Sequence, residues 1–190
     1  MIEHHTLQPG EKLVLASASP RRAELLEKAS IPFVKCPVDF DEDSIRESQP
    51  SRLVRLLAEA KAEACNLEGL VLGADTVVAL EGRIFGKPAN MDEAHSFLKT
   101  LSGKTHQVHT GVCLRRSNVK LSWTATSQVT FKTLDDNAIN EYFTYVNPLD
   151  KAGAYAIQQK GELIITSYEG LLSTIIGLPI EEVCQILTFK

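Results

Sequence analysis

The chain has 190 residues, of which 44% are hydrophobic and 23% charged, proportions typical of a globular enzyme. The formal net charge of −4 argues against broad nucleic-acid binding, which normally requires a basic excess, so we expect no stable nucleic-acid complex. The length suffices for one sizeable domain, or for two small lobes that share a continuous core.

The first half of the chain alternates between strand and helix patterns. Residues 12–16 predict a short buried strand, after which Ser19 and Pro20 begin a helix that runs to about Ala29. A strand is predicted over 33–38, and a polar, acidic loop over 39–49. The clearest helix spans 51–66. Its apolar residues form a stripe that we expect to face the core: Leu53, Leu56, Leu57, Ala60 and Ala64.

The second half mixes hairpins with helices. Residues 70–80 predict an apolar strand that turns at Glu81-Gly82 into a second strand over 83–85. Helices are predicted over 92–101, 135–146 and 179–187, and strands over 105–115, 120–132 and 162–167. This order predicts an α/β fold with a mixed, twisted β-sheet flanked by helices.

The cysteines and the apolar segments bear on the cellular compartment. Cys36, Cys65, Cys113 and Cys184 lie far apart, and without a CxxC pair the sequence excludes a zinc ribbon or a dithiol redox motif. We expect free, mostly buried thiols in a reducing cytosol. Residues 1–11 predict a flexible terminus without a signal peptide, and no apolar stretch is long enough to cross a membrane. The predicted localisation is cytoplasmic.

The segment S-A-S-P-R-R (17–22) lies at a predicted strand-to-helix junction. Free N–H groups and the positive dipole end of a helix attract anions there. Arg21 and Arg22 in the first turn therefore each destabilise the helix by on the order of 0.3–1 kcal/mol, and a bound phosphate would offset this loss. On composition alone, two arginines that simply lie in solvent are as consistent with the sequence as a phosphate site.

Asp75 interrupts the apolar run L-V-L-G-A-D-T-V-V-A-L (70–80). A carboxylate in such a strand is costly unless it is paired, hydrogen-bonded or bound to a metal. Gly73 and Ala74 are expected to leave space for a ligand beside the backbone. The alternatives are a strand end that emerges into solvent and a structural hydrogen bond to a loop. Asp75 is the strongest single-residue indication of a site.

Other charged residues are weaker indications. Lys61 lies at the edge of the apolar stripe, where a lysine commonly extends into solvent, and Lys87 in G-K-P is alone typical of an ordinary loop lysine. The acidic run D-F-D-E-D (39–43) is typical of a solvated loop, although Mg²⁺ also selects carboxylate oxygens. His106 and His109 are expected on opposite faces of one strand, so without a bulge they cannot share a metal.

Eight segments in order along nearly the whole chain resemble the Maf family of nucleotide pyrophosphatases. They are L-A-S-A-S-P-R-R (15–22), D-E-D (41–43), L-A-E-A-K-A (57–62), L-G-A-D-T-V-V (72–78), G-K-P (86–88), S-G-K-T-H-Q-V-H-T-G (102–111), D-K-A-G-A-Y-A-I-Q (150–158) and I-G-L-P-I (176–180). By contrast, no P-loop, G-x-G-x-x-G or G-x-S-x-G motif occurs. The resemblance implies a single domain over residues 1–190, an ITPase-like fold of two lobes with a central cleft, and a homodimer.

The resemblance also implies an enzyme that hydrolyses a nucleoside triphosphate to the monophosphate and pyrophosphate, with Mg²⁺ or Mn²⁺ as cofactor. Asp75 matches the family's catalytic aspartate, expected to activate water and to bind the metal, and Glu42 matches a second acidic residue at the metal. The residues that match phosphate-binding positions are Ser17, Arg22, Lys61 and Lys87.

Three residues bear on the choice of substrate. The dTTP/UTP-type subgroup carries S-P-R-R, a G-A-D-T motif and a glutamine after G-A-Y-x-I, and Arg21, Thr76 and Gln158 match that pattern. The subgroup that prefers 7-methyl-GTP carries tryptophan for the first arginine and a Ser-Asp-Gln motif. A glutamine amide can pair with both a carbonyl and an N–H of a pyrimidine edge. Two departures from the family pattern, at 159–160 and 169–173, bear on base preference.

The implied activity is hydrolysis of dTTP and UTP, or of modified pyrimidine nucleotides, with roles in excluding modified nucleotides from nucleic acid and in cell division. Four alternatives stay open. They are a 7-methyl-GTP-type pyrophosphatase of the same family, a phosphatase that releases orthophosphate, a non-catalytic nucleotide- or RNA-binding regulator, and a purely regulatory protein that acts on cell division through partners.

Overall fold

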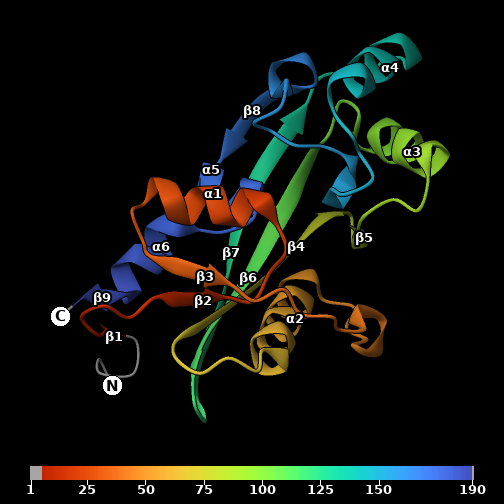
Figure 1. Ribbon diagram of the computed structural model, residues 1–190. Helices are drawn as coiled ribbons and strands as arrows, with labels where there is room; N and C mark the ends of the chain where they lie inside the picture. The colour runs from red at the N-terminus through yellow and green to blue at the C-terminus, as the bar shows by residue number, and fades with distance from the viewer. Residues whose placement is uncertain (1–5, 190) are drawn as a thin grey trace. The chain divides into compact units, whose positions relative to one another are not determined.

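The computed structural model describes residues 6–189, in which a seven-stranded mixed sheet has the order β3-β2-β4-β6-β7-β8, with β5 beside β4 (Figure 1). Its strands are β2 (Leu13–Leu15), β3 (Phe33–Lys35), β4 (Val71–Leu80), β5 (Arg83–Phe85), β6 (Thr105–Arg116), β7 (Val119–Phe131) and β8 (Ile165–Glu169). Strand β2 is parallel to both β3 and β4, whereas the β4–β5 and β7–β8 pairs are antiparallel. The predicted mixed α/β class is confirmed.

The helices largely follow the predicted ranges. They are α1 (Pro20–Lys28), α2 (Pro50–Ala64), α3 (Met91–Leu101), α4 (Asp136–Tyr145), α5 (Leu172–Ile176) and α6 (Ile180–Ile186), with short 3-10 turns η2 (Glu42–Ser44), η3 (Ala152–Ala154) and η4 (Gly161–Leu163). Helix α5 was not predicted. The strand predicted over 162–167 begins only at Ile165, because η4 occupies the residues before it. Every helix in this part of the chain is too short or too polar to cross a bilayer.

The chain forms two compact units. The first contains the residues up to Asp75, Thr110–Ala125 and the segment from Gly177 onward, and the second contains Thr76–His109 and Thr126–Ile176. In the second unit, α3 and α4 pack with η3 against one core whose largest side chains include Phe85, Phe97 and Tyr142.

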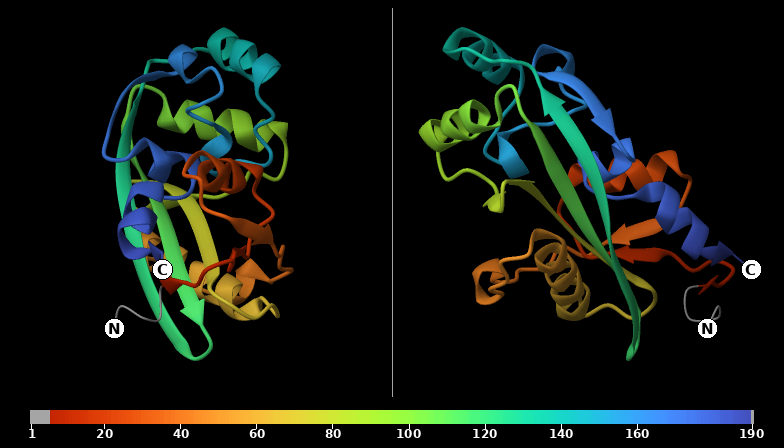
Figure 2. Two further views of the ribbon diagram at one scale, coloured as in Figure 1. Left: turned by 60° about the vertical axis from the view of Figure 1, so that its left-hand side comes forward. Right: turned by 180° about the vertical axis from the view of Figure 1, so that it is seen from behind.

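In the first unit, the sheet is covered on both faces. Leu13 and Leu15 of β2 pack in one core with α1 and α6, whereas Val14, the residue between them, packs in another core with α2. This division follows from the alternation of side chains along a strand. Helices α1 and α2 accordingly lie on opposite sides of β2 (Figures 1 and 2).

A second, two-stranded sheet joins the two ends of the chain. Strand β1 (Thr6–Leu7) pairs in parallel with β9 (Thr188–Phe189), and Thr6 and Leu7 are both buried. The predicted flexible terminus covers residues 1–11. Of these, residues 6 and 7 form β1, and residues 1–5 lie outside the described part of the chain.

Helix α2 buries a different face from the one that its leucines predict. Its buried residues are Val54, Leu57, Ala58 and Ala62, so of the predicted stripe only Leu57 is fully buried. The reason lies in two glycines on which the helix rests. A Cβ added at Gly73 of β4 would lie 2.2 Å from the carbonyl oxygen of Ala58, and one at Gly111 of β6 would lie 2.2 Å from that of Val54. The close approach selects small helix residues over large ones.

The same contact corrects the expectation that Gly73 leaves space for a ligand. The space beside Gly73 is filled by the backbone of α2, and Ala74 is fully buried. Glycine at positions 73 and 111 therefore sets the distance between α2 and the sheet, and with it the position of every side chain that α2 carries.

We expect Gly111→Ala to destabilise the protein, because the added methyl group meets backbone atoms of α2 that cannot rotate away. Overpacking of this kind typically costs about 1–3 kcal/mol or more. Urea unfolding measures the loss, with Gly86→Ala as the matched control, since a Cβ at Gly86 meets nothing within 4 Å. Equal stability of the two variants would contradict the proposed contact.

Candidate active site

Asp75 lies in β4 with only 7% of its surface exposed, within a strand that is otherwise buried and almost entirely apolar. Its carboxylate is paired: Lys61 Nζ donates to Asp75 Oδ1 over 2.5 Å. The strand therefore does not end in solvent at this point, which removes one of the alternative interpretations. The pairing instead meets the condition under which a carboxylate can be buried.

Lys61 links two carboxylates rather than extending into solvent. Its Nζ also lies 2.8 Å from Oε1 of Glu42, which belongs to η2. The side chains of Lys61 and Asp75 are 13% and 10% exposed, whereas that of Glu42 is 47% exposed. A single ammonium group is thus held between one buried and one half-exposed carboxylate.

Burial dominates the electrostatics of Asp75. Removal from water raises the pKa of the Asp75 carboxyl, and the charge of Glu42 raises it further. The positive charges of Lys61 and Arg22 act in the opposite direction without cancelling the effect of burial. A carboxylate with a raised pKa binds a proton more readily, and this is the property required of a general base near neutral pH.

Ser17 and Arg22 contact one another at the start of α1. Ser17 Oγ accepts hydrogen bonds from Arg22 Nη1 (2.9 Å) and from the backbone N–H of Ser19 (3.2 Å). Arg22 Nε donates to the carbonyl oxygen of Gly177, 2.8 Å away in the I-G-L-P segment. Burial lowers the pKa of Arg22, and the charge of Asp75 raises it. Hydrogen-bond acceptors of the protein therefore stabilise the positive charge of Arg22 at this helix N-terminus, in addition to any bound anion.

Arg21 precedes Arg22 at the start of α1 and is half-buried. Its positive charge lowers the pKa of Arg22. Two like charges are therefore held close together at a helix N-terminus, as predicted. This concentration of positive charge is suited to phosphate groups.

The acidic segment contributes one carboxylate to this site. Asp41 caps η2 by accepting from the backbone N–H of Asp43 (3.1 Å), and the residues of the run are mostly exposed, as expected of a solvated loop. Within residues 6–189, no group of three or more His, Cys, Asp and Glu side chains is arranged to hold a metal. Asp75 and Glu42 do converge on one cation, the Lys61 ammonium. Two carboxylates suit Mg²⁺, which fills its other positions with water and phosphate oxygens.

Thr76, Lys87 and Gln158 lie in the second unit. Thr76 follows Asp75 directly in β4, whereas Lys87 and Gln158 are exposed. The turn that carries Lys87 is fixed, because the backbone N–H of Gly153 donates to the carbonyl oxygen of Gly86 over 3.0 Å. Gly153 itself adopts φ 67° against Val78, where a Cβ would lie 2.8 Å from the valine side chain.

Sequence reasoning missed two features of the motif segments. Lys151 is only 5% exposed, and its Nζ donates to the carbonyl oxygen of Asn147 (2.8 Å) and to Asp150 Oδ1 (2.6 Å). The available signal for a buried lysine was its position directly before the small residues A-G-A in D-K-A-G-A. The bond from Arg22 to Gly177 spans 155 positions and had no local signal.

His106 and His109 are separate, as predicted. His106 Nε2 lies 2.8 Å from the Tyr155 hydroxyl, and His109 Nδ1 lies 2.9 Å from Thr126 Oγ1. Burial lowers the pKa of His106 to about 4, so its ring is neutral at physiological pH. Neither histidine contributes to the Asp75 cluster.

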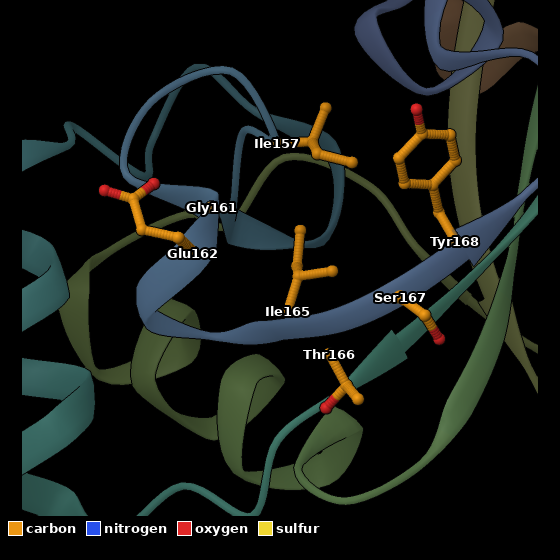
Figure 3. Close-up of a pocket in the computed structure, with 7 residues that line it drawn as sticks. All are labelled: Ile157, Gly161, Glu162, Ile165, Thr166, Ser167 and Tyr168. Atoms are coloured by element: carbon orange, nitrogen blue, oxygen red, sulfur yellow. The ribbon is translucent and has the colours of Figure 1, made fainter.

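A shallow pocket of about 420 Å³ lies within the second unit, against η4 and β8 (Figure 3). It is lined by Ile157, Gly161, Glu162, Ile165, Thr166, Ser167 and Tyr168. The side chains of Ile157 and Ile165 both approach Gly161, where an added Cβ would lie 3.5 Å and 3.4 Å from them, respectively (Figure 3). None of the predicted site residues lines this pocket, although Gln158 directly follows Ile157 in the chain. Its one carboxylate, Glu162, has a side chain that is 69% exposed, whereas Asp75 is buried and ion-paired, so the cluster of Asp75, Lys61 and Glu42 is the better candidate.

Comparison with known proteins decides the family. The family model for Maf-like proteins matches residues 12–189. The chain belongs to the Maf family. Its curated relatives include the dTTP/UTP pyrophosphatase of Bacillus cereus, 46% identical over 90% of this chain and 91% of that protein. The dTTP/UTP pyrophosphatase of Bacillus anthracis is 42% identical over 92% and 93%, respectively.

Solved structures are also similar to this chain. The Staphylococcus aureus Ham1 protein matches 80% of this Maf chain and 90% of its own, with a TM-score of 0.48 and 17% identity. The ion-paired residues Glu42, Lys61 and Asp75 all lie inside the range that the Maf family model matches.

We expect the Asp75 carboxyl of this Maf protein to make stability depend on pH. Because its pKa is raised, the folded state holds the proton more tightly than the unfolded chain. The stabilising contribution is therefore complete below the ordinary pKa of 3.8 and is lost as the pH rises through the raised folded pKa. In metal-free buffer, wild type should therefore lose stability relative to Asp75→Asn as the pH rises over that interval.

Urea unfolding across this pH range measures the difference, with Asp43→Asn in η2 as the matched exposed carboxylate. A stability difference between wild type and Asp75→Asn that stays constant with pH, or that grows in favour of wild type, would contradict the raised pKa.

Proposed function

We propose that this protein hydrolyses dTTP and UTP to the nucleoside monophosphate and pyrophosphate. The observation that carries the proposal is the buried Asp75 carboxylate, paired through Lys61 with Glu42 and raised in pKa. The names of the relatives, which are dTTP/UTP pyrophosphatases, support the substrate.

In the proposed reaction, Asp75 accepts a proton from water while the water oxygen attacks the α-phosphorus. The bond from that phosphorus to the α–β bridging oxygen breaks, and pyrophosphate leaves with the bridging oxygen and the bonding electron pair. The raised pKa of Asp75 suits this role because it increases the carboxylate's affinity for the proton.

Asp75 and Glu42 are the residues that would hold the divalent cation, as Mg²⁺ or Mn²⁺. When bound, the cation supplies positive charge to the phosphate oxygens. In the structure, the Lys61 ammonium lies between these carboxylates, and a lysine on a flexible stem can exchange one anionic partner for another. We propose that Lys61 turns from the carboxylates to a phosphate oxygen when substrate arrives.

The remaining predicted site residues are assigned to the phosphates and to the nucleotide base. Ser17, Arg22 and Lys87 are proposed to bind phosphate oxygens. Arg22 is already held by Ser17 and Gly177, which fixes its orientation before substrate binds. Arg21, Thr76 and Gln158 are proposed to set the preference for pyrimidine nucleotides, canonical or modified.

Several wider properties belong to the same proposal. The match of the family model along residues 12–189 supports one domain built from both units. The free cysteines support the reducing cytoplasm as its compartment. We further propose that the protein is a homodimer, that its acidic net charge disfavours nucleic-acid complexes, and that its activity limits modified nucleotides and influences cell division.

Loss of the Asp75 carboxylate should abolish turnover without unfolding the protein. We expect Asp75→Asn to lower kcat for UTP with Mg²⁺ by about 100-fold or more, as for loss of a general base. Asp43→Asn should keep wild-type turnover. Assays that separate pyrophosphate from orthophosphate measure the effect.

The same assay distinguishes the alternatives. Orthophosphate as the first product would indicate a phosphatase, and faster turnover of 7-methyl-GTP than of UTP would indicate the other subgroup. Near-normal pyrophosphate release by Asp75→Asn would refute its proposed role.

Gln158 should affect recognition of the base more than the chemical step. Loss of a pair of hydrogen bonds predicts a fall in kcat/KM for UTP and dTTP of about tenfold for Gln158→Ala, mainly through KM. Gln185→Ala removes an exposed glutamine of α6, which belongs to none of the predicted site residues, and is the matched control. If both variants lose activity equally, Gln158 does not read the base.

A further inference from the structure

Three of the four cysteines meet in one place in the first unit. Cys36 follows β3, Cys65 caps the C-terminus of α2, and Cys113 lies in β6, and all three belong to the core beneath α2. The Sγ atoms of Cys36 and Cys65 are 3.0 Å apart, although 29 positions separate them in sequence. Their wide spacing in the sequence had excluded a dithiol motif.

The separation of the two sulfur atoms is close to that of a covalent bond. A disulfide has a sulfur–sulfur distance of about 2.05 Å, so the two atoms need to approach by roughly 1 Å. Both residues lie at the ends of their elements: Cys36 directly follows β3, where its backbone N–H donates to the carbonyl oxygen of Leu15 in β2 (2.9 Å), and Cys65 is the C-cap of α2. Arg115 holds that end of α2 in place by donating to the carbonyl oxygens of Ala62 (2.9 Å) and Cys65 (3.0 Å).

We propose that Cys36 and Cys65 form a reversible disulfide when the protein meets a peroxide. The pair is a site of oxidative modification separate from the residues assigned to the proposed hydrolysis. Because three thiols gather here, a metal is the alternative occupant, but no metal-binding group of three is found among residues 6–189. A thiol couple is therefore the chemistry that the geometry supports.

The difference in exposure between the two thiols determines which of them reacts first with the peroxide. Cys36 is the more accessible, whereas Cys65 is 4% exposed and burial raises the pKa of its thiol. The Cys36 sulfur attacks a peroxide oxygen, the O–O bond breaks, and Cys36 becomes a sulfenic acid as the alcohol or water leaves. The Cys65 sulfur then attacks the Cys36 sulfur, loses its proton and expels water. Overall, two thiols give two electrons and two protons to the peroxide.

The other cysteines provide internal controls. Cys113 is fully buried, and burial raises the pKa of its thiol to about 12, so it stays protonated and unreactive. Cys184 is exposed on α6 and belongs to neither core of the first unit. Oxidation should therefore select Cys36 and Cys65 over both.

The disulfide would close a loop that carries important residues. The segment from Cys36 to Cys65 contains η2 with Glu42 and helix α2 with Lys61. Closing a loop of about 30 residues restricts the unfolded chain and stabilises the folded state. For a protein of this length, we expect the melting temperature to rise by roughly 5–10 °C.

The test uses the reduced full-length protein, treated with one to a few equivalents of hydrogen peroxide and then alkylated under denaturing conditions. The proposal predicts alkylation of two of the four cysteines, an intact mass about 2 Da lower before alkylation, and one linked peptide pair containing Cys36 and Cys65. Dithiothreitol should restore four reactive thiols and the original melting temperature. Cys184→Ser should behave as wild type, whereas Cys36→Ser should lose the link and the thermal shift.

If Cys36→Ser folds poorly, the alkylation and mass measurements on wild type alone test the proposal. Retention of four alkylated thiols, a gain of one or more oxygen atoms at Cys36 without the link, or a link that instead contains Cys113 or Cys184 would each overturn the proposal.

Discussion

The arrangement of the site depends on one buried ion pair, between Asp75 in the sheet and Lys61 on α2. A carboxylate inside an apolar strand is tolerated only if a partner reaches it. Lys61 reaches it because α2 lies unusually close to the sheet, at a distance that Gly73 and Gly111 permit. The ion pair therefore depends on the close approach of α2 to the sheet, which in turn depends on the two glycines and on the small residues of the helix.

This close approach also explains why the pKa of Asp75 is raised. The pair lacks the solvent that would otherwise stabilise its charges, so the pKa of Asp75 is raised in spite of its positive neighbours. Functional sites often retain such unfavourable features because the chemistry uses them. Glu42 is half-exposed on η2, so the ion-paired cluster reaches solvent at this carboxylate.

Much of this could be predicted from local patterns in the sequence. The apolar run around Asp75, the Ser19-Pro20 helix start and the Glu81-Gly82 turn are properties of short segments, and the structure places each where the pattern predicts. The roles of Glu42 and Lys61 came only from resemblance to the Maf family, because their separate positions on a loop and on a helix do not reveal that they meet.

Apart from the local contacts of Lys151 and the short helix α5, the features that were missed involve partners distant in sequence. The buried face of α2 is selected by glycines on β4 and β6, which the helix's own periodicity cannot reveal. The pairing of β1 with β9 joins opposite ends of the chain, and the Cys36–Cys65 contact joins a strand end to a helix end. In each case, the local pattern was compatible with several partners and tertiary packing selected one.

The most direct measurement is an NMR titration of the Asp75 side-chain carboxyl carbon, assigned by comparison with Asp75→Asn, without and with Mg²⁺. The pKa should lie above the ordinary 3.8 in metal-free protein and should fall when Mg²⁺ is added, because a bound cation favours the ionised carboxylate. A carboxyl that titrates at or below its ordinary value, and does not respond to Mg²⁺, would contradict the role assigned to Asp75.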